Sequence, residues 1–417
     1  MNLDHVAHLA CMVCGREYPA GNIYVCTEHG NEGILDVRYH HDQIALTRES
    51  LAADGDPTMW RYRAVMPVAS DATLPPPTVG GTPTYEAPRL AEQVGVGRLW
   101  VKDEGRQPTA SLKDRASAMA VVKAQEFDAA VITTASTGNA AAALSGLCAG
   151  VGQPNVIFVP ESAPEAKVAQ LLAYGSTVVL VRGNYSDAFD LCMAAAESHG
   201  WYNRNTGFNP YMTEGKKTAM FELLEQLAWD VPDAVFVSVG DGSIIGGLHK
   251  GAEDALALGL IDSIPRLYGI QAAGSDFMVQ AFEVGEDVLT KAPIAADTIA
   301  DSISADLPRD RIKAMAAVIE TGGSYLRVSD GAILEAIPAL ARGSGVFAEP
   351  AGAAAYAGVL EAVDRGLVGP SDRIAVVSTG SGLKDVAAAM QAASAVGTEP
   401  LHVAPDLAAL DAALEAR

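Results

Sequence analysis

The sequence predicts an α/β protein with parallel sheets covered by helices, and two observations support this fold class. From Leu99 onward, short apolar runs of strand length alternate with longer helical patterns, as in residues 155–159, 164–172, 177–181 and 185–196. Such alternation is typical of parallel sheets with helices on both faces. The chain has 417 residues, of which 49% are hydrophobic and 19% charged, so it can bury a large core in two or three lobes.

The charge of the chain limits its partners. The formal net charge is −22, which argues against nucleic acid and anionic membranes as partners because neither is attracted by that field. No apolar run approaches the roughly 20 residues of a membrane span. Residues 1–10 carry Asp4, His5 and His8 instead of a basic and then apolar signal sequence. We therefore expect a cytoplasmic protein that acts on a small molecule, and an anionic substrate would need a local basic pocket.

Three apolar runs are each followed by a polar turn that contains glycine. We read the three apolar runs as buried parallel strands, at residues 129–134, 234–239 and 373–377. The turns that follow them, in the same order, are residues 136–139, 240–243 and 378–382. In open α/β sheets, ligands bind at the carboxyl ends of the strands. The three turns are therefore expected to converge on one crevice and to form a single site.

Lys113 lies in the octet PTASLKDR, which is read as a loop that opens a helix. Ala118, Val121 and Val122 recur at helical spacing, and Lys123 is polar, so we expect an amphipathic helix. The dipole at a helix start disfavours positive charge, so this amine can form an imine with an aldehyde cofactor. A solvated helix lysine is the alternative for the octet alone. The accompanying turns favour the cofactor role.

In order and spacing, these motifs resemble the fold-type II pyridoxal-phosphate enzymes and, within them, the threonine synthases. The likeness covers most of the chain: GGTPT at 80–84, the lysine octet, STGN at 136–139, NP at 209–210, EG at 214–215, the glycine loop at 240, EPAG at 349–352 and TGSGLKD at 379–385. The resemblance implies a two-lobed fold-type II pyridoxal-phosphate fold (tryptophan synthase β-like) and a homodimer. It divides the chain into a large cofactor domain, residues 41–128 and 211–417, and a smaller α/β domain, residues 129–210.

The resemblance also implies roles for individual residues toward pyridoxal 5'-phosphate. Lys113 would form the imine and, once released, carry the α-proton of the substrate. Asn139 would donate to the phenolic oxygen of the cofactor, and the hydroxyl group of Thr379 would face the pyridine nitrogen. The cofactor phosphate would be held by the turn formed by Gly240, Asp241, Gly242, Ser243 and Ile244. The substrate carboxylate would be held by Ser136, Thr137 and Gly138.

The implied activity is that of a threonine synthase, which converts O-phosphohomoserine and water to threonine and phosphate. The chain departs from the family pattern in its substrate half. Met212 stands where similar enzymes carry a phosphate-binding arginine, and Ser381 stands where they carry a histidine. Lys216, Lys217, Arg182 and Arg204 are candidates to compensate. A β-eliminating or β-replacing lyase acting on threonine, serine or a related amino acid is therefore the alternative, and a non-catalytic cofactor-binding protein is a third, disfavoured possibility.

The amino-terminal region predicts a separate small module. Cys11, Cys14, Cys26 and His29 have the spacing C-x2-C-x11-C-x2-H, which is close to that of a zinc ribbon. We expect residues 1–40 to form a zinc-ribbon-like module, with unmetallated thiols as the alternative. Four protein ligands would leave no open position, so a bound zinc would be structural. Cys148 and Cys192 lie in apolar runs and are expected to be packing thiols.

Overall fold

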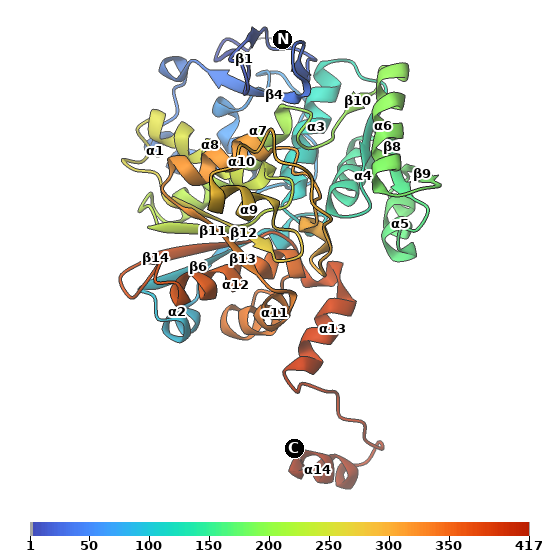
Figure 1. Ribbon diagram of the computed structural model, residues 1–417, viewed down its shortest axis with the longest axis vertical. Helices are drawn as coiled ribbons and strands as arrows, with labels where there is room; N and C mark the ends of the chain where they lie inside the picture. The colour runs from blue at the N-terminus through green and yellow to red at the C-terminus, as the bar shows by residue number, and fades with distance from the viewer. Residues whose placement is uncertain (1–2, 417) are drawn as a thin grey trace.

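Three β-sheets organise the chain, and each draws its strands from a different part of the sequence (Figure 1). The structure is a computed structural model that describes residues 3–416. The amino-terminal sheet is antiparallel, with the strand order β2-β1-β4-β3. Its strands are β1 (Val6–Cys11), β2 (Glu17–Tyr18), β3 (Val25–Cys26) and β4 (Gly30–Tyr39).

The second sheet is parallel throughout and has the order β10-β7-β8-β9. Its strands are β7 (Ile132–Ala135), β8 (Asn155–Pro160), β9 (Thr177–Val181) and β10 (Tyr202–Asn203). The helices between them are α4 (Asn139–Val151), α5 (Glu165–Ala173) and α6 (Tyr185–His199). The strands and helices that the sequence predicts between residues 129 and 196 are confirmed, with ends that differ by a few residues.

The third and largest sheet has the order β13-β12-β11-β14-β6-β5, and only β5 runs antiparallel to its neighbour. Its strands are β5 (Thr84–Glu86), β6 (Arg98–Asp103), β11 (Ala234–Ser238), β12 (Arg266–Ala272), β13 (Ser324–Val328) and β14 (Arg373–Ser378). The remaining α-helices up to the last strand are α1 (Arg48–Ala53), α2 (Pro88–Val94), α3 (Lys113–Glu126), α7 (Tyr211–Gln226), α8 (Ser243–Ala257), α9 (Phe277–Val284), α10 (Arg311–Glu320), α11 (Asp330–Ser344) and α12 (Pro350–Asp364). The parallel α/β fold is therefore confirmed.

Apolar side chains of the large sheet are buried on both of its faces. Along β11, Phe236 belongs to one apolar cluster, whereas its neighbours Val235 and Val237 belong to another. The side chains of a strand alternate between the two faces of its sheet, so helices cover both faces. This double burial explains why the strand reads as a continuous apolar run rather than as an alternating pattern.

Helix α3 differs from the sequence prediction. We expected a polar side at Lys123, but α3 packs between α4 and α7, and Lys123 is fully buried. Its ammonium group donates to the Pro67 carbonyl oxygen at 2.9 Å and pairs with the Glu126 carboxylate. A carboxylate and a carbonyl group thus satisfy the charge inside the protein, which the spacing of apolar residues does not reveal.

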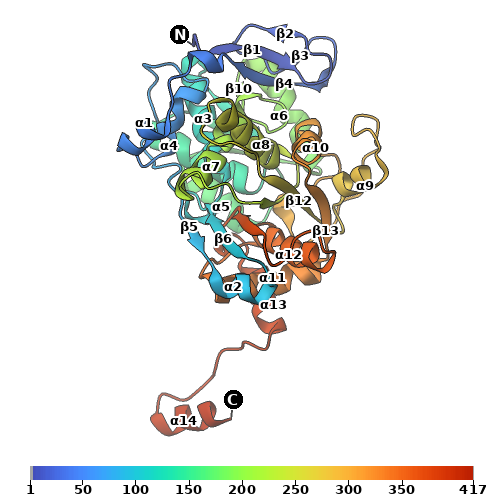
Figure 2. The same ribbon diagram turned by 90° about the vertical axis from the view of Figure 1, so that its left-hand side faces the viewer.

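The carboxyl-terminal region forms α13 (Val386–Ala395) and then α14 (Leu407–Glu415), which projects away from the rest of the chain in both views (Figures 1 and 2). Among the described residues, no helix is both long and apolar enough to cross a membrane. The domain boundaries stay a prediction.

Candidate active site

A cavity of about 820 Å³ lies where the carboxyl ends of the second and third sheets face each other. This volume suits a small-molecule ligand together with a cofactor. Its lining includes the turns that follow β7, β11 and β14, together with the start of α3. The structure therefore brings the three predicted turns and Lys113 into one site.

Lys113 is the first residue of α3 and faces this cavity. Its position is set by the preceding loop, because the Leu112 backbone N–H donates to the Thr379 carbonyl oxygen at 2.9 Å. Burial lowers the pKa of the Lys113 amine, and Arg204 lowers it further, against the opposing effect of Asp241. From the sequence, we expected the helix dipole to disfavour the charge of Lys113, whereas in the structure burial is the largest cause of its lowered pKa.

Asn139 begins α4, and its side-chain amide donates to Glu349 Oε1 at 2.7 Å and to Ser302 Oγ at 3.3 Å. Burial raises the pKa of the Glu349 carboxyl group to about 7, although Asn139 opposes the shift. Glu349 was not among the predicted site residues. The only signal for it in the sequence is its place in the EPAG motif directly before α12.

The predicted phosphate turn has the shape of an anion site. Gly242 has a φ of 91°, and a Cβ atom there would lie 2.6 Å from the Ala314 Cβ atom, so only glycine fits without movement. No side chain caps the start of α8, which leaves its first N–H groups free to bind an anion. Ser243 and Ile244 begin this helix and line the cavity.

Asp241 also lines the cavity, and burial raises the pKa of its carboxyl group, although Arg309 opposes this shift. Protonation of Asp241 would reduce its repulsion of a phosphate group. The predicted substrate loop lies opposite, with Ser136, Thr137 and Gly138 in the same lining. Ser136 Oγ accepts from the Gly138 backbone N–H at 3.3 Å, which shapes this turn.

Thr379 follows β14 and lines the cavity, as expected for a residue that faces a ligand. Next to it, the buried hydroxyl groups of Ser238 and Ser378 have no hydrogen-bond partner among the described residues. They end β11 and β14, whose preceding residues Val237 and Val377 are paired in register. Buried polar groups are normally satisfied. Two unsatisfied hydroxyl groups at one sheet edge therefore fit a polar cofactor at this position.

Positively charged side chains gather at one side of the cavity. Arg204 is buried and donates to Ser117 Oγ at 3.1 Å and Thr206 Oγ1 at 3.3 Å, while its Nη2 atom has no partner among the described residues. Lys216 is also buried and donates to Ser243 Oγ in the cofactor turn. None of the described carboxylates forms an ion pair with either side chain.

The electrostatics of this group follow from burial. Burial lowers the pKa of Arg204 to about 10, so the guanidinium group keeps its charge at neutral pH. Burial also lowers the pKa of Lys216 well below its ordinary value, and the nearby charges of Lys113 and Arg204 add to the effect. Arg309 completes the group from the cavity lining, with its guanidinium carbon 3.8 Å from the centre of the Phe189 ring. Arg309 was not among the predicted site residues, because no sequence motif contains it.

The other candidates for compensation do not face the cavity. Lys217 Nζ lies 2.7 Å from Glu214 Oε2 and 2.6 Å from Asp254 Oδ2, so its charge is already paired. Arg182 is exposed and is not part of the lining. Met212 is 1% exposed within an apolar cluster, so an arginine at that position would be buried among apolar side chains. Of the candidates named from the sequence, Arg204 lines the cavity, and Lys216 lies next to the lining, where it contacts Ser243 of the cofactor turn.

Ser381 lies beside the lysine loop. Its backbone N–H donates to the Ala110 carbonyl oxygen at 3.0 Å, and its hydroxyl group accepts from the Leu383 backbone N–H at 3.4 Å. The side chain therefore turns back onto its own segment and closes the turn that follows Thr379.

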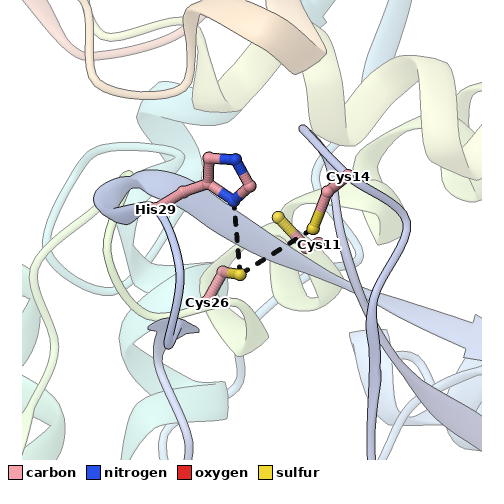
Figure 3. A group of neighbouring side chains, drawn as sticks. All are labelled: Cys11, Cys14, Cys26 and His29. Atoms are coloured by element: carbon pink, nitrogen blue, oxygen red, sulfur yellow. Dashed lines mark hydrogen bonds between the residues drawn. The ribbon is translucent and has the colours of Figure 1, made fainter.

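A second group of side chains, Cys11, Cys14, Cys26 and His29, comes together in the amino-terminal sheet (Figure 3). Their ligand atoms all lie within 4.8 Å of one another, and the Cys14 and Cys26 sulfur atoms are 3.9 Å apart. In a tetrahedral zinc site, with Zn–S bonds of about 2.3 Å, two sulfur ligands lie about 3.8 Å apart. A Cβ atom on Gly33 would lie 2.6 Å from Cys26 Cβ, so the close approach of β4 requires glycine. The donor set fits a tetrahedral metal ion.

Comparisons with known proteins agree with this site. Residues 76–380 match the family described as "Pyridoxal-phosphate dependent enzyme". The chain is 38% identical to threonine synthase of Methanosarcina acetivorans, across 91% of this chain and 92% of that protein. It is 35% identical to threonine synthase of Methanocaldococcus jannaschii, across 95% of this chain and 96% of that protein.

Solved structures show the same fold. Threonine deaminase isoform 2 of Solanum lycopersicum superposes with a TM-score of 0.64 at 22% identity and covers 76% of this chain and 84% of that one. Diaminopropionate ammonia lyase of Escherichia coli superposes with a TM-score of 0.63 at 18% identity and covers 75% of this chain and 86% of that one. The fold, the converging turns and the extent of the sequence identity place this chain among the pyridoxal-phosphate-dependent enzymes, in the threonine synthase family.

Proposed function

We propose that the protein is a pyridoxal-phosphate-dependent threonine synthase that converts O-phosphohomoserine and water to threonine and phosphate. The observation that carries this proposal is the cavity itself, which joins Lys113, an uncapped helix start and buried cations without carboxylate partners. Threonine synthase relatives that match over more than nine-tenths of the chain support the same reaction.

The residues around the cavity suit the parts of the cofactor. The N–H groups at residues 240–244 would bind its phosphate, and the Thr379 hydroxyl group would donate to its ring nitrogen. The Asn139 amide would exchange its 3.3 Å contact with Ser302 Oγ for a hydrogen bond to the phenolic oxygen. Bound pyridoxal phosphate would supply an aldehyde that joins an amino group and a ring that withdraws electrons from the Cα–H bond. A hydroxyl donor leaves the ring nitrogen unprotonated, which favours elimination and replacement over transamination.

Lys113 would hold the cofactor and then move the substrate proton. Because burial lowers its pKa, a larger fraction of the amine is neutral at neutral pH and can accept a proton from the substrate Cα atom. Its position at the start of α3 places it within the same cavity as the carboxylate-binding loop at residues 136–138. This loop would fix the α-carboxylate, so that the Cα–H bond points toward Lys113.

Arg204 and Arg309, which line the cavity, would hold the phosphate group of the substrate, and Lys216 would add positive charge next to Ser243. Charged groups this deep in a protein are costly unless an opposite charge accompanies them. The free Nη2 atom of Arg204 offers a donor for a phosphate oxygen. These side chains would take the role of the phosphate-binding arginine that similar enzymes carry at the position of Met212.

A β-eliminating or β-replacing lyase acting on threonine or serine is the alternative. Met212 and Ser381 favour it, because both departures fall in the substrate half of the site. The unpaired cations favour the phosphorylated substrate instead, since serine and threonine bring only one negative charge.

For the cofactor role, Lys113→Ala should lose both the visible absorption band of the bound cofactor and all measurable turnover. Lys113→Arg keeps a positive charge but cannot form an imine, so it should lose the band as well. Absorption spectra and assays of the purified variants provide the measurement. Full turnover in either variant would refute the role of Lys113.

For the substrate phosphate, Arg204→Gln should lower kcat/KM for O-phosphohomoserine by one to two powers of ten, because a charge-assisted contact contributes roughly 1.5–3 kcal/mol. Elimination from threonine should change little. Arg182→Ala is the control, because Arg182 is exposed and lies outside the cavity lining.

Side-by-side assays with O-phosphohomoserine, threonine and serine decide between the two reactions. An equal loss for all three substrates in Arg204→Gln would show that Arg204 does not act on the phosphate. If the unaltered protein turns over only threonine or serine, the lyase replaces the threonine synthase.

The amino-terminal Cys and His group would bind one structural zinc ion, because its four ligands leave no open coordination position. Metal analysis of the purified protein should find about one zinc per chain. Cys11→Ser should lose the metal and melt at a lower temperature, whereas Cys148→Ala should keep the metal. A purified protein without metal would contradict the zinc site.

The protein would act as a cytoplasmic homodimer without nucleic-acid or membrane partners. The net charge of −22 supports the absence of such partners. Helix α14 exposes three leucine side chains: Leu407 is 75% exposed, Leu410 37% and Leu414 55%. Apolar side chains exposed in this way support a contact of α14 with a second copy of the chain. Sedimentation should give twice the chain mass of 43.2 kDa, and a monomer at micromolar concentration would contradict the dimer.

A further inference from the structure

The amino-terminal sheet lies against the helices that carry the cofactor turn (Figures 1 and 2). The contact is made by β4, whose buried Asp36 receives lysines from two different helices. Lys250 of α8 places its Nζ atom 2.8 Å from Asp36 Oδ2, and Lys313 of α10 places its Nζ atom 3.1 Å from Asp36 Oδ1. One carboxylate therefore joins α8 to α10.

The same lysines also bind the backbone of β4. Lys250 donates to the Val37 carbonyl oxygen at 2.6 Å, and Lys313 donates to the Leu35 carbonyl oxygen at 3.0 Å. Burial alone would raise the pKa of Asp36, but the two lysines outweigh it and hold the pKa well below its ordinary value. Asp36 is therefore charged at neutral pH. Lys250 donates a charge-assisted hydrogen bond to it, and Lys313 forms an ion pair with it.

Both helices lead directly to the cofactor turn. α8 begins immediately after Gly242, and the Asp310 backbone N–H, just before α10, donates to the Asp241 carbonyl oxygen at 2.8 Å. The two helices pack closely, since a Cβ atom on Gly246 would lie 2.9 Å from the Lys313 Cβ atom. A shift of α10 against α8 would therefore change the shape of the turn.

We propose that Asp36 is a positioning residue for the cofactor phosphate, because it fixes α8 against α10 and so sets the geometry of the turn at residues 240–243. This inference rests on the proposed function, in which that turn binds the phosphate. The amino-terminal module thereby becomes part of the active-site framework. Its Cys and His group adjoins the same strand, since Cys11 of β1 pairs in register with Leu35.

The test compares Asp36→Asn with Glu126→Gln. Both changes neutralise a buried carboxylate that faces a lysine, but Glu126 ends α3 and does not touch α8 or α10. For each purified variant, we would measure the dissociation constant of pyridoxal phosphate, the phosphorus NMR signal of the bound cofactor and the midpoint of denaturant unfolding.

Asp36→Asn should raise the dissociation constant about tenfold and shift or broaden the phosphorus signal, as expected for a residue that orients a binding group. Asp36→Glu should recover part of the affinity. Glu126→Gln should lower the unfolding midpoint without changing either cofactor measurement. A purely structural role for Asp36 would give the Glu126→Gln result in both variants, and this outcome would overturn the inference.

A further variant keeps the test decisive if Asp36→Asn does not fold. Lys313→Met removes only the contact to α10 and leaves the Asp36–Lys250 pair in place. It should weaken cofactor binding in the same direction, and unchanged affinity would overturn the inference. If the unaltered protein itself fails to bind pyridoxal phosphate, the proposed function is wrong, independently of Asp36.

Discussion

The site depends on the placement of positive charge inside an acidic protein. The chain has a formal net charge of −22, yet Lys113, Arg204 and Lys216 share the surroundings of one cavity without an ion-pair partner among the described carboxylates. Unpaired buried charge is costly, and the lowered pKa values of these groups are its signature. Anionic ligands would remove the cost.

Other buried cations of this chain are paired, and the contrast separates structural from functional charge. Arg115 contacts the carboxylates of Glu104 and Glu222 at 2.7 Å and 2.6 Å, and Lys102 contacts Glu222 at 2.9 Å. These groups join strands and helices beneath the site and need no ligand. The same is true of Asp36 with its two lysines. Among the described buried cations, those near the cavity lack a carboxylate partner, which is why they mark the position of the ligands.

Much of the site could be predicted from the sequence, because its parts are local. The turns after β7, β11 and β14 follow apolar strands, and Lys113 begins a helix, so pattern alone placed them at one edge. Contacts between distant segments could not be predicted in this way. Arg309 reaches the cavity from a loop without a motif, and the sequence does not show that Glu349 meets Asn139. The burial of Lys123 was missed because one of its two partners, the Pro67 carbonyl group, comes from a distant segment of the chain.

The unpaired cations would form a second phosphate site beside the cofactor turn. The most direct measurement is a titration of the cofactor-loaded protein with inorganic phosphate, followed by phosphorus NMR at low ionic strength. One phosphate per chain should bind saturably and give a signal separate from that of the cofactor. In Arg204→Gln, this binding should weaken while the cofactor signal remains, because Arg204 contacts Ser117 and Thr206 and not the cofactor turn. Absence of saturable binding in the unaltered protein, or equal binding in Arg204→Gln, would show that the cations do not form a phosphate site.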